Sequence, residues 1–82
     1  MQYFVYILQS LKDHNYYIGS TSNVEARVKY HNAGLQRSTR SRIPFKLVLF
    51  EMFETKNEAL LREKQIKSWK GGNEFKKLIR GK

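Results

Sequence analysis

Five residues in this sequence have side chains that could do chemistry together: Tyr6, Tyr17, Arg27, His31 and Glu63. The sequence has no cysteine, no HExxH motif, no glycine-rich phosphate loop and no recognisable Ser-His-Asp set. A single glutamate can hold a hard cation such as Mg²⁺, because this ion keeps several water ligands. An arginine can clamp a phosphate, and a phenolate or a neutral imidazole can take a proton from water. The set matches the needs of phosphodiester hydrolysis.

The two tyrosines lie in short apolar runs that predict β-strands. Residues 3–8 are rich in β-branched and aromatic side chains, and residues 16–19 form a second, shorter run. The polar residues 12–15 between them predict a turn, so the two runs should form a hairpin. Gly19 shares a strand face with Tyr17 and leaves it bare, so a ligand or another backbone can come close there. Taken alone, the two tyrosines fit a core better than a site.

The next predicted helix carries an arginine and a histidine on its apolar face. Ser22 and Glu25 have capping-box spacing, which predicts a helix that begins near Asn23 and ends at residues 32–34. Four residues at i, i+3, i+4 and i+7 share one face: Val24, Arg27, Val28 and His31. A snorkelling arginine and a structural histidine would explain the same pattern, so the functional interpretation is about even with the structural one.

A later helix carries the glutamate. The run from residue 55 to about residue 69 opens with a capping box and predicts a helix. Glu63 has apolar neighbours one turn before it and one turn after it, so its carboxylate faces apolar surface. That position is costly unless the carboxylate is paired with a cation or bound to a metal. Arg62 or Lys67 could supply the pairing, and a metal site is the favoured interpretation.

Three further segments complete the predicted order β-β-α-β-α-α. Residues 45–53 have a mostly two-sided apolar character and predict a third strand that pairs with the hairpin. Residues 35–44 contain serine, threonine and three arginines, which predicts a mobile basic loop. Residues 74–80 predict a last short helix. All of this fits one small domain over residues 1–82.

Charge is the strongest compositional signal. Sixteen lysines and arginines against seven acidic residues give a formal net charge of +9. No acidic residue lies between Glu25 and Glu51, and a second basic block begins at Lys64. Nucleic acid fits this charge better than an anionic membrane, because no basic segment is also a strongly hydrophobic amphipath. The residues expected to contact nucleic acid are Arg37, Arg40, Arg42, Lys64 and Lys67.

The same composition predicts a cytoplasmic protein. The longest apolar run has six residues, far short of a membrane span, and no signal-peptide pattern precedes it. The absence of cysteine agrees with a reducing compartment.

The order of the chemical residues resembles the GIY-YIG nuclease superfamily. Val5-Tyr6-Ile7 is followed by Tyr17-Ile18-Gly19-Ser20-Thr21 and then by Arg27-x-x-x-His31-Asn32. The match continues through Thr39, Pro44 and residues 59–67, so it covers nearly the whole chain. The chain most resembles the stand-alone, single-domain bacterial branch of this superfamily. Val5 replaces the first glycine of the motif.

The resemblance implies an α/β (α+β) sandwich, in which a central three-stranded antiparallel sheet is flanked by helices. It also implies a DNA endonuclease that uses one divalent metal, Mg²⁺ or Mn²⁺, and acts in DNA repair or processing. Branched and flapped DNA are candidate substrates, RNA stays open, and the protein is expected as a monomer or a homodimer. The alternatives are a non-catalytic nucleic-acid-binding module that keeps the fold and an RNA-directed or ribosome-associated role.

The resemblance also implies a role for each residue of the set. In the family the two motif tyrosines line the site, and Tyr6 and Tyr17 occupy these positions. One of them orients or deprotonates the attacking water. Arg27 matches the phosphate-binding arginine, and His31 matches a histidine or tyrosine that contacts the phosphate or the leaving oxygen. Glu63 matches the metal-binding glutamate.

Overall fold

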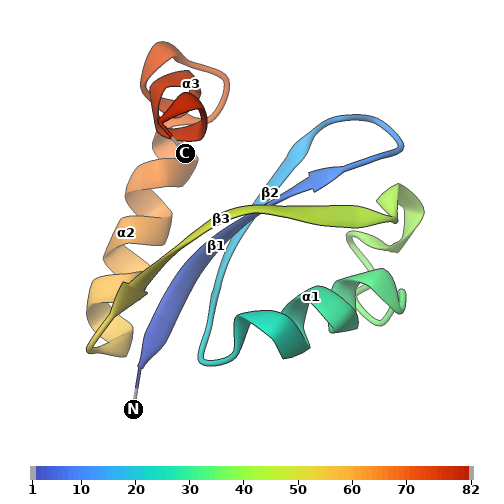
Figure 1. Ribbon diagram of the computed structural model, residues 1–82, viewed down its shortest axis with the longest axis horizontal. Helices are drawn as coiled ribbons and strands as arrows, with labels where there is room; N and C mark the ends of the chain where they lie inside the picture. Colours follow the sequence, from blue (N-terminus) through green and yellow to red (C-terminus); the bar gives the residue numbers. More distant parts are fainter. Residues whose placement is uncertain (1, 82) are drawn as a thin grey trace.

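A three-stranded antiparallel sheet lies between two layers of helices in the computed structural model, which describes residues 2–81 (Figure 1). The chain passes through β1 (Tyr3–Ser10), β2 (Tyr16–Thr21), α1 (Val24–Asn32), the short 3₁₀ helix η1 (Arg40–Arg42), β3 (Phe45–Phe53), α2 (Lys56–Trp69) and α3 (Asn73–Arg80). The predicted order of strands and α-helices is therefore confirmed.

The strands lie in the order β2-β1-β3, with β1 antiparallel to both neighbours. In the register of the hairpin, Tyr6 is opposite Gly19 and Leu8 is opposite Tyr17. These four residues share one face of the sheet, as the alternation along a strand predicts. The central position of β1 explains its apolar character, because both of its faces are covered.

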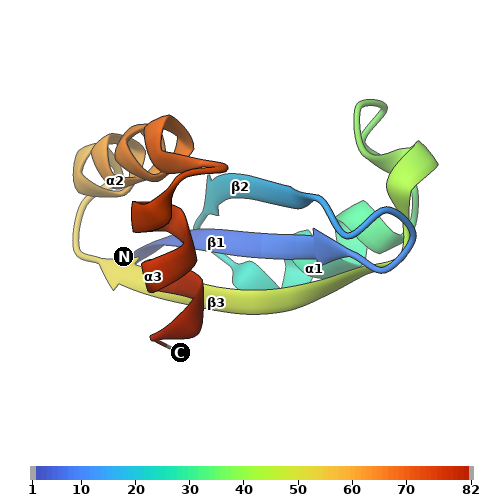
Figure 2. The ribbon, with the colours of Figure 1, turned by 90° about the horizontal axis from the view of Figure 1, so that it is seen from above.

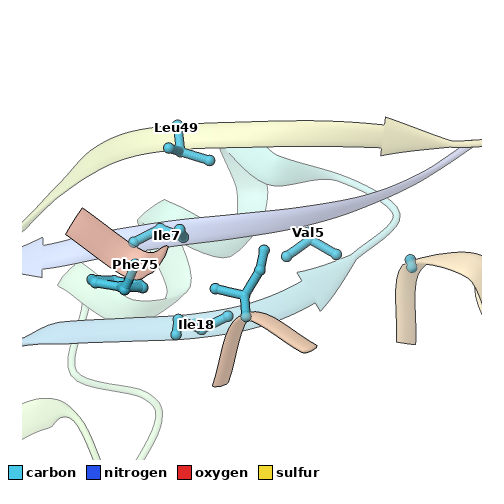
Figure 3. Close-up of a cluster of buried hydrophobic side chains, with 7 residues drawn as sticks. Val5, Ile7, Ile18, Leu49 and Phe75 are labelled. Carbon is cyan, nitrogen blue, oxygen red and sulfur yellow. The ribbon is translucent and has the colours of Figure 1, made fainter. Parts of the chain in front are cut away.

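Each face of the sheet has its own core. On one face, α2 and α3 pack on the strands, and Phe75 of α3 reaches the same cluster as β1 and β2 (Figure 3). This larger core consists of Val5, Ile7, Ile18, Leu49, Ala59, Ile66 and Phe75. On the other face, α1 covers a smaller core of Tyr6, Leu8 and Phe45. Tyr6 is therefore part of the layer under α1, where His31 also lies.

The predicted third strand is confirmed as β3, but the two-sided apolar character of its residues does not reflect burial of both faces. β3 is an edge strand, and Leu47, Phe50 and Met52 are exposed on it. The helix on this face has nine residues, or about 14 Å of length, against about 30 Å for a strand of the same number of residues. It therefore covers only part of the apolar face.

The helix ends agree with the sequence in one case and differ in another. Asn23, and not Ser22, caps α1, because its side chain accepts a hydrogen bond from the backbone N–H of Ala26. The predicted capping box of Thr55 and Glu58 is confirmed at the start of α2. Within residues 2–81, no helix combines the length and the apolar character that crossing a membrane requires.

The segment between α1 and β3, which its composition predicts as a mobile basic loop, has some regular structure. It contains η1, and its ends are fixed by hydrogen bonds to the strands. The Asn32 side chain bonds both the N–H and the carbonyl of Phe45, and the Ser10 hydroxyl donates to the Arg42 carbonyl. This segment therefore has a defined path along one end of the sheet.

Candidate active site

The five chemical residues come from four elements: β1, β2, α1 and α2. The hairpin supplies Tyr6 and Tyr17, α1 supplies Arg27 and His31, and α2 supplies Glu63. Figure 2 shows α2 beside β2, on the side of the sheet opposite β3. A cavity of about 250 Å³ opens there between the starts of the two helices. Its lining includes Ser20, Thr21, Ser22, Arg27, Lys56 and Ala59.

A buried hydrogen-bonded chain links Tyr6, His31 and Thr39. The Tyr6 hydroxyl lies 3.0 Å from His31 Nε2, and His31 Nδ1 lies 3.0 Å from Thr39 Oγ1. The Thr39 hydroxyl donates to the Gln36 carbonyl at 3.3 Å, so it accepts from His31 Nδ1–H. His31 Nε2 is then an acceptor, and Tyr6 donates its hydroxyl proton to it. All three side chains are buried, so bulk water does not reach the His31 ring.

Burial determines the protonation states of Tyr6 and His31. Desolvation, followed by the negative charges of Tyr17 and Glu63, raises the pKa of Tyr6 far above its usual value, although Arg27 opposes this shift. Desolvation and the nearby Arg27 charge lower the pKa of His31. At neutral pH the structure therefore holds a neutral imidazole and a protonated Tyr6 phenol.

Gly19 makes room for the Tyr6 hydroxyl. A Cβ added at residue 19 would lie 2.5 Å from the Tyr6 hydroxyl oxygen and 2.7 Å from its Cζ. The bare strand face that the sequence left open to a ligand or another backbone is therefore occupied by the Tyr6 ring. Glycine is required here for space and not for backbone conformation.

Tyr17 is the more accessible of the two motif phenols. Its side chain is half-buried, whereas Tyr6 is 1% exposed. The Gln36 side-chain amide donates to the Tyr17 hydroxyl oxygen at 3.0 Å, and the Tyr17 ring centroid lies 4.8 Å from that of His31. Gln36 was missed in the sequence, because one amide in a polar segment carries no periodic or spacing signal.

Arg27 is a cation that has no acidic partner among the residues that the structure describes. It is half-buried on α1, lines the cavity beside β2 and lies over the Tyr30 ring at 5.2 Å. Within residues 2–81 its guanidinium makes no ion pair, yet its charge acts on both Tyr6 and His31. A guanidinium in this position is available to bind an anionic oxygen.

Glu63 is largely buried and already has a cationic neighbour. Its side chain is 16% exposed, and Lys67 Nζ lies 2.7 Å from its Oε2. Arg62, the other predicted partner, instead bonds Glu51 of β3 through two nitrogens. No group of three or more His, Cys, Asp and Glu side chains gathers within residues 2–81. One carboxylate still fits Mg²⁺ or Mn²⁺, because hard cations accept water and substrate phosphate as further ligands.

Comparison with known proteins identifies the family. The model of the GIY-YIG catalytic domain matches residues 2–77 of this chain. The chain belongs to the GIY-YIG family. It is 46% identical to a UPF0213 protein of Staphylococcus haemolyticus over 69 residues, 83% of each chain. It is 52% identical to a UPF0213 protein of Clostridium perfringens over 65 residues, 78% of this chain and 69% of that protein.

A solved structure supports the GIY-YIG fold independently. The solution NMR structure of a UPF0213 protein from Bacillus halodurans superposes with a TM-score of 0.64 at 36% sequence identity. The match covers 100% of this chain and 86% of that one. The α+β fold and the resemblance read from the motifs are therefore confirmed. Membership of the GIY-YIG family indicates a nuclease-type domain with nucleic acid as the substrate class.

The basic residues expected to contact nucleic acid are not equivalent in this GIY-YIG domain. Arg37, Arg40 and Lys64 are exposed. Lys67 is paired with Glu63. Arg42 is bound to Asp13 at 3.1 Å and lies over a phenylalanine ring, so much of its interaction capacity is used inside the fold.

Proposed function

We propose that this chain is a metal-dependent DNA endonuclease that hydrolyses phosphodiester bonds with one divalent cation. The observation that carries the proposal is the convergence of the buried Tyr6–His31 pair, the unpaired Arg27 and the shielded Glu63 around β2. The charge of Arg27 acts on both Tyr6 and His31, and the charge of Glu63 acts on Tyr6. The charges of Arg27, the proposed phosphate-binding group, and of Glu63, the proposed metal-binding group, therefore both affect the Tyr6 phenol.

Arg27 binds the scissile phosphate in this proposal. Its guanidinium lacks an ion pair within residues 2–81 and lies at a cavity wall that also carries the hydroxyls of Ser20 and Thr21. Paired N–H donors on phosphate oxygens offset the negative charge that grows as the water attacks. The neutral His31 adds no charge of its own, so Arg27 supplies the local cation.

Tyr17 is assigned to the attacking water. It is the motif phenol that water can reach, and the amide of Gln36 holds its oxygen in place. The Tyr6 ring lies close to the Tyr17 ring, with 6.3 Å between the two centroids, and the hydrogen bond to His31 holds Tyr6 in place. The phenolic oxygen orients the water and, when ionised, accepts its proton.

Glu63 would hold the divalent cation, Mg²⁺ or Mn²⁺. When bound, such an ion supplies positive charge that polarises the phosphate and stabilises the leaving oxygen. The carboxylate is well suited to this role because its position on α2 shields it from bulk water. Lys67 Nζ, which lies 2.7 Å from Glu63 Oε2, would have to move away from that oxygen for a cation to bind there.

The substrate is expected to be DNA held mainly through its phosphates, as the net charge of +9 favours. Arg37, Arg40, Arg42, Lys64 and Lys67 are the proposed contacts. Branched or flapped DNA, from repair or processing in the cytoplasm, is the candidate form. The protein would act as a monomer or a homodimer.

A cleavage panel tests this function. Duplex, flapped, branched and single-stranded DNA, together with matched RNA, are incubated with the wild-type chain in Mg²⁺, in Mn²⁺ and in EDTA. The proposal expects cuts in at least one DNA form that require the divalent cation. Cleavage of RNA alone, or equal cleavage in EDTA, would contradict it.

One observation favours a second function. The ion pair between Lys67 and Glu63 is short, at 2.7 Å, and a chain that keeps it closed would bind nucleic acid without cutting it. In that case the same panel shows binding to DNA in EDTA and intact DNA in every metal condition.

A further inference from the structure

A basic groove lies apart from the five-residue site, between the hairpin turn and α3. Its volume is about 390 Å³. Its polar and aromatic lining includes His14, Asn15, Tyr16, Lys70, Lys76 and Arg80. Three of these are permanent cations, and none of the residues that line the groove is acidic.

The two acidic residues that adjoin the groove residues in sequence, Asp13 and Glu74, each have a cationic neighbour outside the groove lining. Asp13 of the turn binds Arg42 at 3.1 Å, and Glu74 of α3 lies 3.6 Å from Lys77. The environment of Lys70 is also basic, because desolvation and then the charges of Arg42 and Lys67, which lie outside the groove lining, lower its pKa, whereas Asp13 raises it.

The groove is built by the packing of α3. Gly71 has φ +86°, a conformation that suits glycine, and it turns the chain back toward β2. Phe75 of α3 then packs edge-on against Tyr16 with ring centroids 5.0 Å apart, while Lys70 donates to the Tyr16 carbonyl. Lys76 and Arg80 are exposed and have no ion pair within residues 2–81. Their ammonium and guanidinium groups are free to bind a ligand.

The helix α2 connects the proposed active site with the groove, because it carries Glu63 and its C-cap residue is Lys70 of the groove lining. Glu63 and Lys67 lie one turn apart on α2, and Lys70 is the residue that directly follows the last residue of this helix, Trp69. The helix from Glu63 to its end rises by about 9 Å, which is about three base steps along one DNA strand.

We propose that this groove is a second phosphate-binding site, which holds the nucleic-acid backbone about three nucleotides from the cleaved bond. The cations of Lys70, Lys76 and Arg80 are its ligands. The inference rests on the proposed nucleic-acid substrate and extends it beyond the motif residues. An anionic membrane would meet the same cations, but the course of α2 from Glu63 to Lys70 favours a strand that also enters the active site.

The test is binding of a fluorescein-labelled DNA duplex, followed by anisotropy in EDTA over a range of salt concentrations. The test variant is the double substitution Lys76→Gln/Arg80→Gln. The matched control is Lys29→Gln/Lys46→Gln, which removes the same charge from α1 and β3, away from β2. Circular dichroism and thermal melting confirm that both variants are folded.

The groove variant should bind about 10-fold or more weakly, and its slope of log K against log salt should fall by about two. The control should lose less than about threefold, with little change in slope. Equal losses in the two variants would overturn the proposal, because the effect would then be general electrostatics. A groove variant that loses binding only to phosphatidylglycerol vesicles, and still binds DNA like the wild type, would overturn it as well.

Because this assay contains no metal, it is independent of cleavage. A wild-type chain that fails to cut DNA, but shows the predicted loss in the groove variant, would contradict the nuclease chemistry and leave the groove assignment standing. A wild-type chain that cuts DNA, together with a groove variant that binds DNA as well as the control variant does, would contradict the groove assignment and leave the nuclease chemistry standing.

Discussion

The Tyr6 hydroxyl and His31 Nε2 are joined by a buried hydrogen bond of 3.0 Å that links the first strand to the first helix. This bond makes a family-motif tyrosine part of the core under α1 and not a freely ionising group. The bond accounts for how Tyr6 can be a core aromatic and a candidate site residue at the same time. It also determines what several substitutions should do.

Gly19→Ala should damage the site through Tyr6. The new Cβ would lie 2.5 Å from the Tyr6 hydroxyl, so the ring must move and its bond to His31 must lengthen or break. We expect a loss of about 1–3 kcal/mol in the free energy of unfolding, the usual range for overpacking a core. Urea denaturation measures this loss. Gly81→Ala is the control, because Gly81 has an ordinary φ of −69° and its Cβ would lie 3.2 Å from the Lys77 carbonyl oxygen, a milder contact than the one at residue 19, so the loss should be smaller.

Substitution of the two motif tyrosines should have different effects, mainly on stability for Tyr6→Phe and mainly on cleavage for Tyr17→Phe. Tyr6→Phe leaves a buried His31 acceptor without a donor, so we expect a loss of about 1–3 kcal/mol in the free energy of unfolding. Tyr17→Phe should cost less than about 1 kcal/mol, because the Gln36 amide is only partly buried. It should nevertheless slow cleavage by about 100-fold or more. Unfolding curves and single-turnover cleavage, measured side by side, check this. Full activity of Tyr17→Phe would rule out the assignment of the water to Tyr17.

Much of this arrangement could be predicted from the sequence, because it depends on local regularities. The alternation of Tyr6 and Tyr17 with Gly19 along two strands, and the capping box at Thr55 and Glu58, are set by neighbouring residues. Their periods and spacings are visible in a single chain.

Other parts depend on contacts between distant segments. Gln36 and Thr39 lie in a segment that reads as a polar loop, yet they bond Tyr17 and His31 of other elements. The exposed face of β3 depends on the length of α1, since the residues of β3 itself are mostly apolar on both faces. These contacts and this exposure depend on tertiary packing, so they could not be predicted from composition alone.

Stability should fall as the pH is lowered through the range in which histidine titrates. His31 has a lowered pKa in the folded chain, so the unfolded chain takes up its proton first, at about pH 6.5. The stability gained from a neutral buried His31 is therefore complete above that pH and is lost below it, until the folded pKa is passed. Urea titrations between about pH 7.5 and about pH 5.5 should show this loss. His14→Gln should keep it, whereas His31→Gln should weaken it.

Arg27 and Arg40 should differ in cleavage although both are cations. Arg27 lines the cavity beside β2, whereas Arg40 is exposed in η1. Arg27→Ala should reduce cleavage by about 100-fold or more, because a donor to developing charge is lost. Arg40→Ala should stay within about threefold of wild type at moderate salt. Initial cleavage rates at saturating DNA compare the two, and equal small losses would mean that both act only through general charge.

The most direct test of the nuclease proposal is the cleavage rate of Glu63→Ala on the DNA form that the wild type cuts, in Mg²⁺ and in Mn²⁺. Glu54→Ala is the control, because Glu54 is an exposed carboxylate just before α2. We expect Glu63→Ala to lose cleavage by about 100-fold or more while its DNA binding in EDTA stays within about threefold of wild type. Glu54→Ala should cut normally. A Glu63→Ala chain that cuts at the wild-type rate would contradict the assignment of the metal to Glu63 and the mechanism built on it.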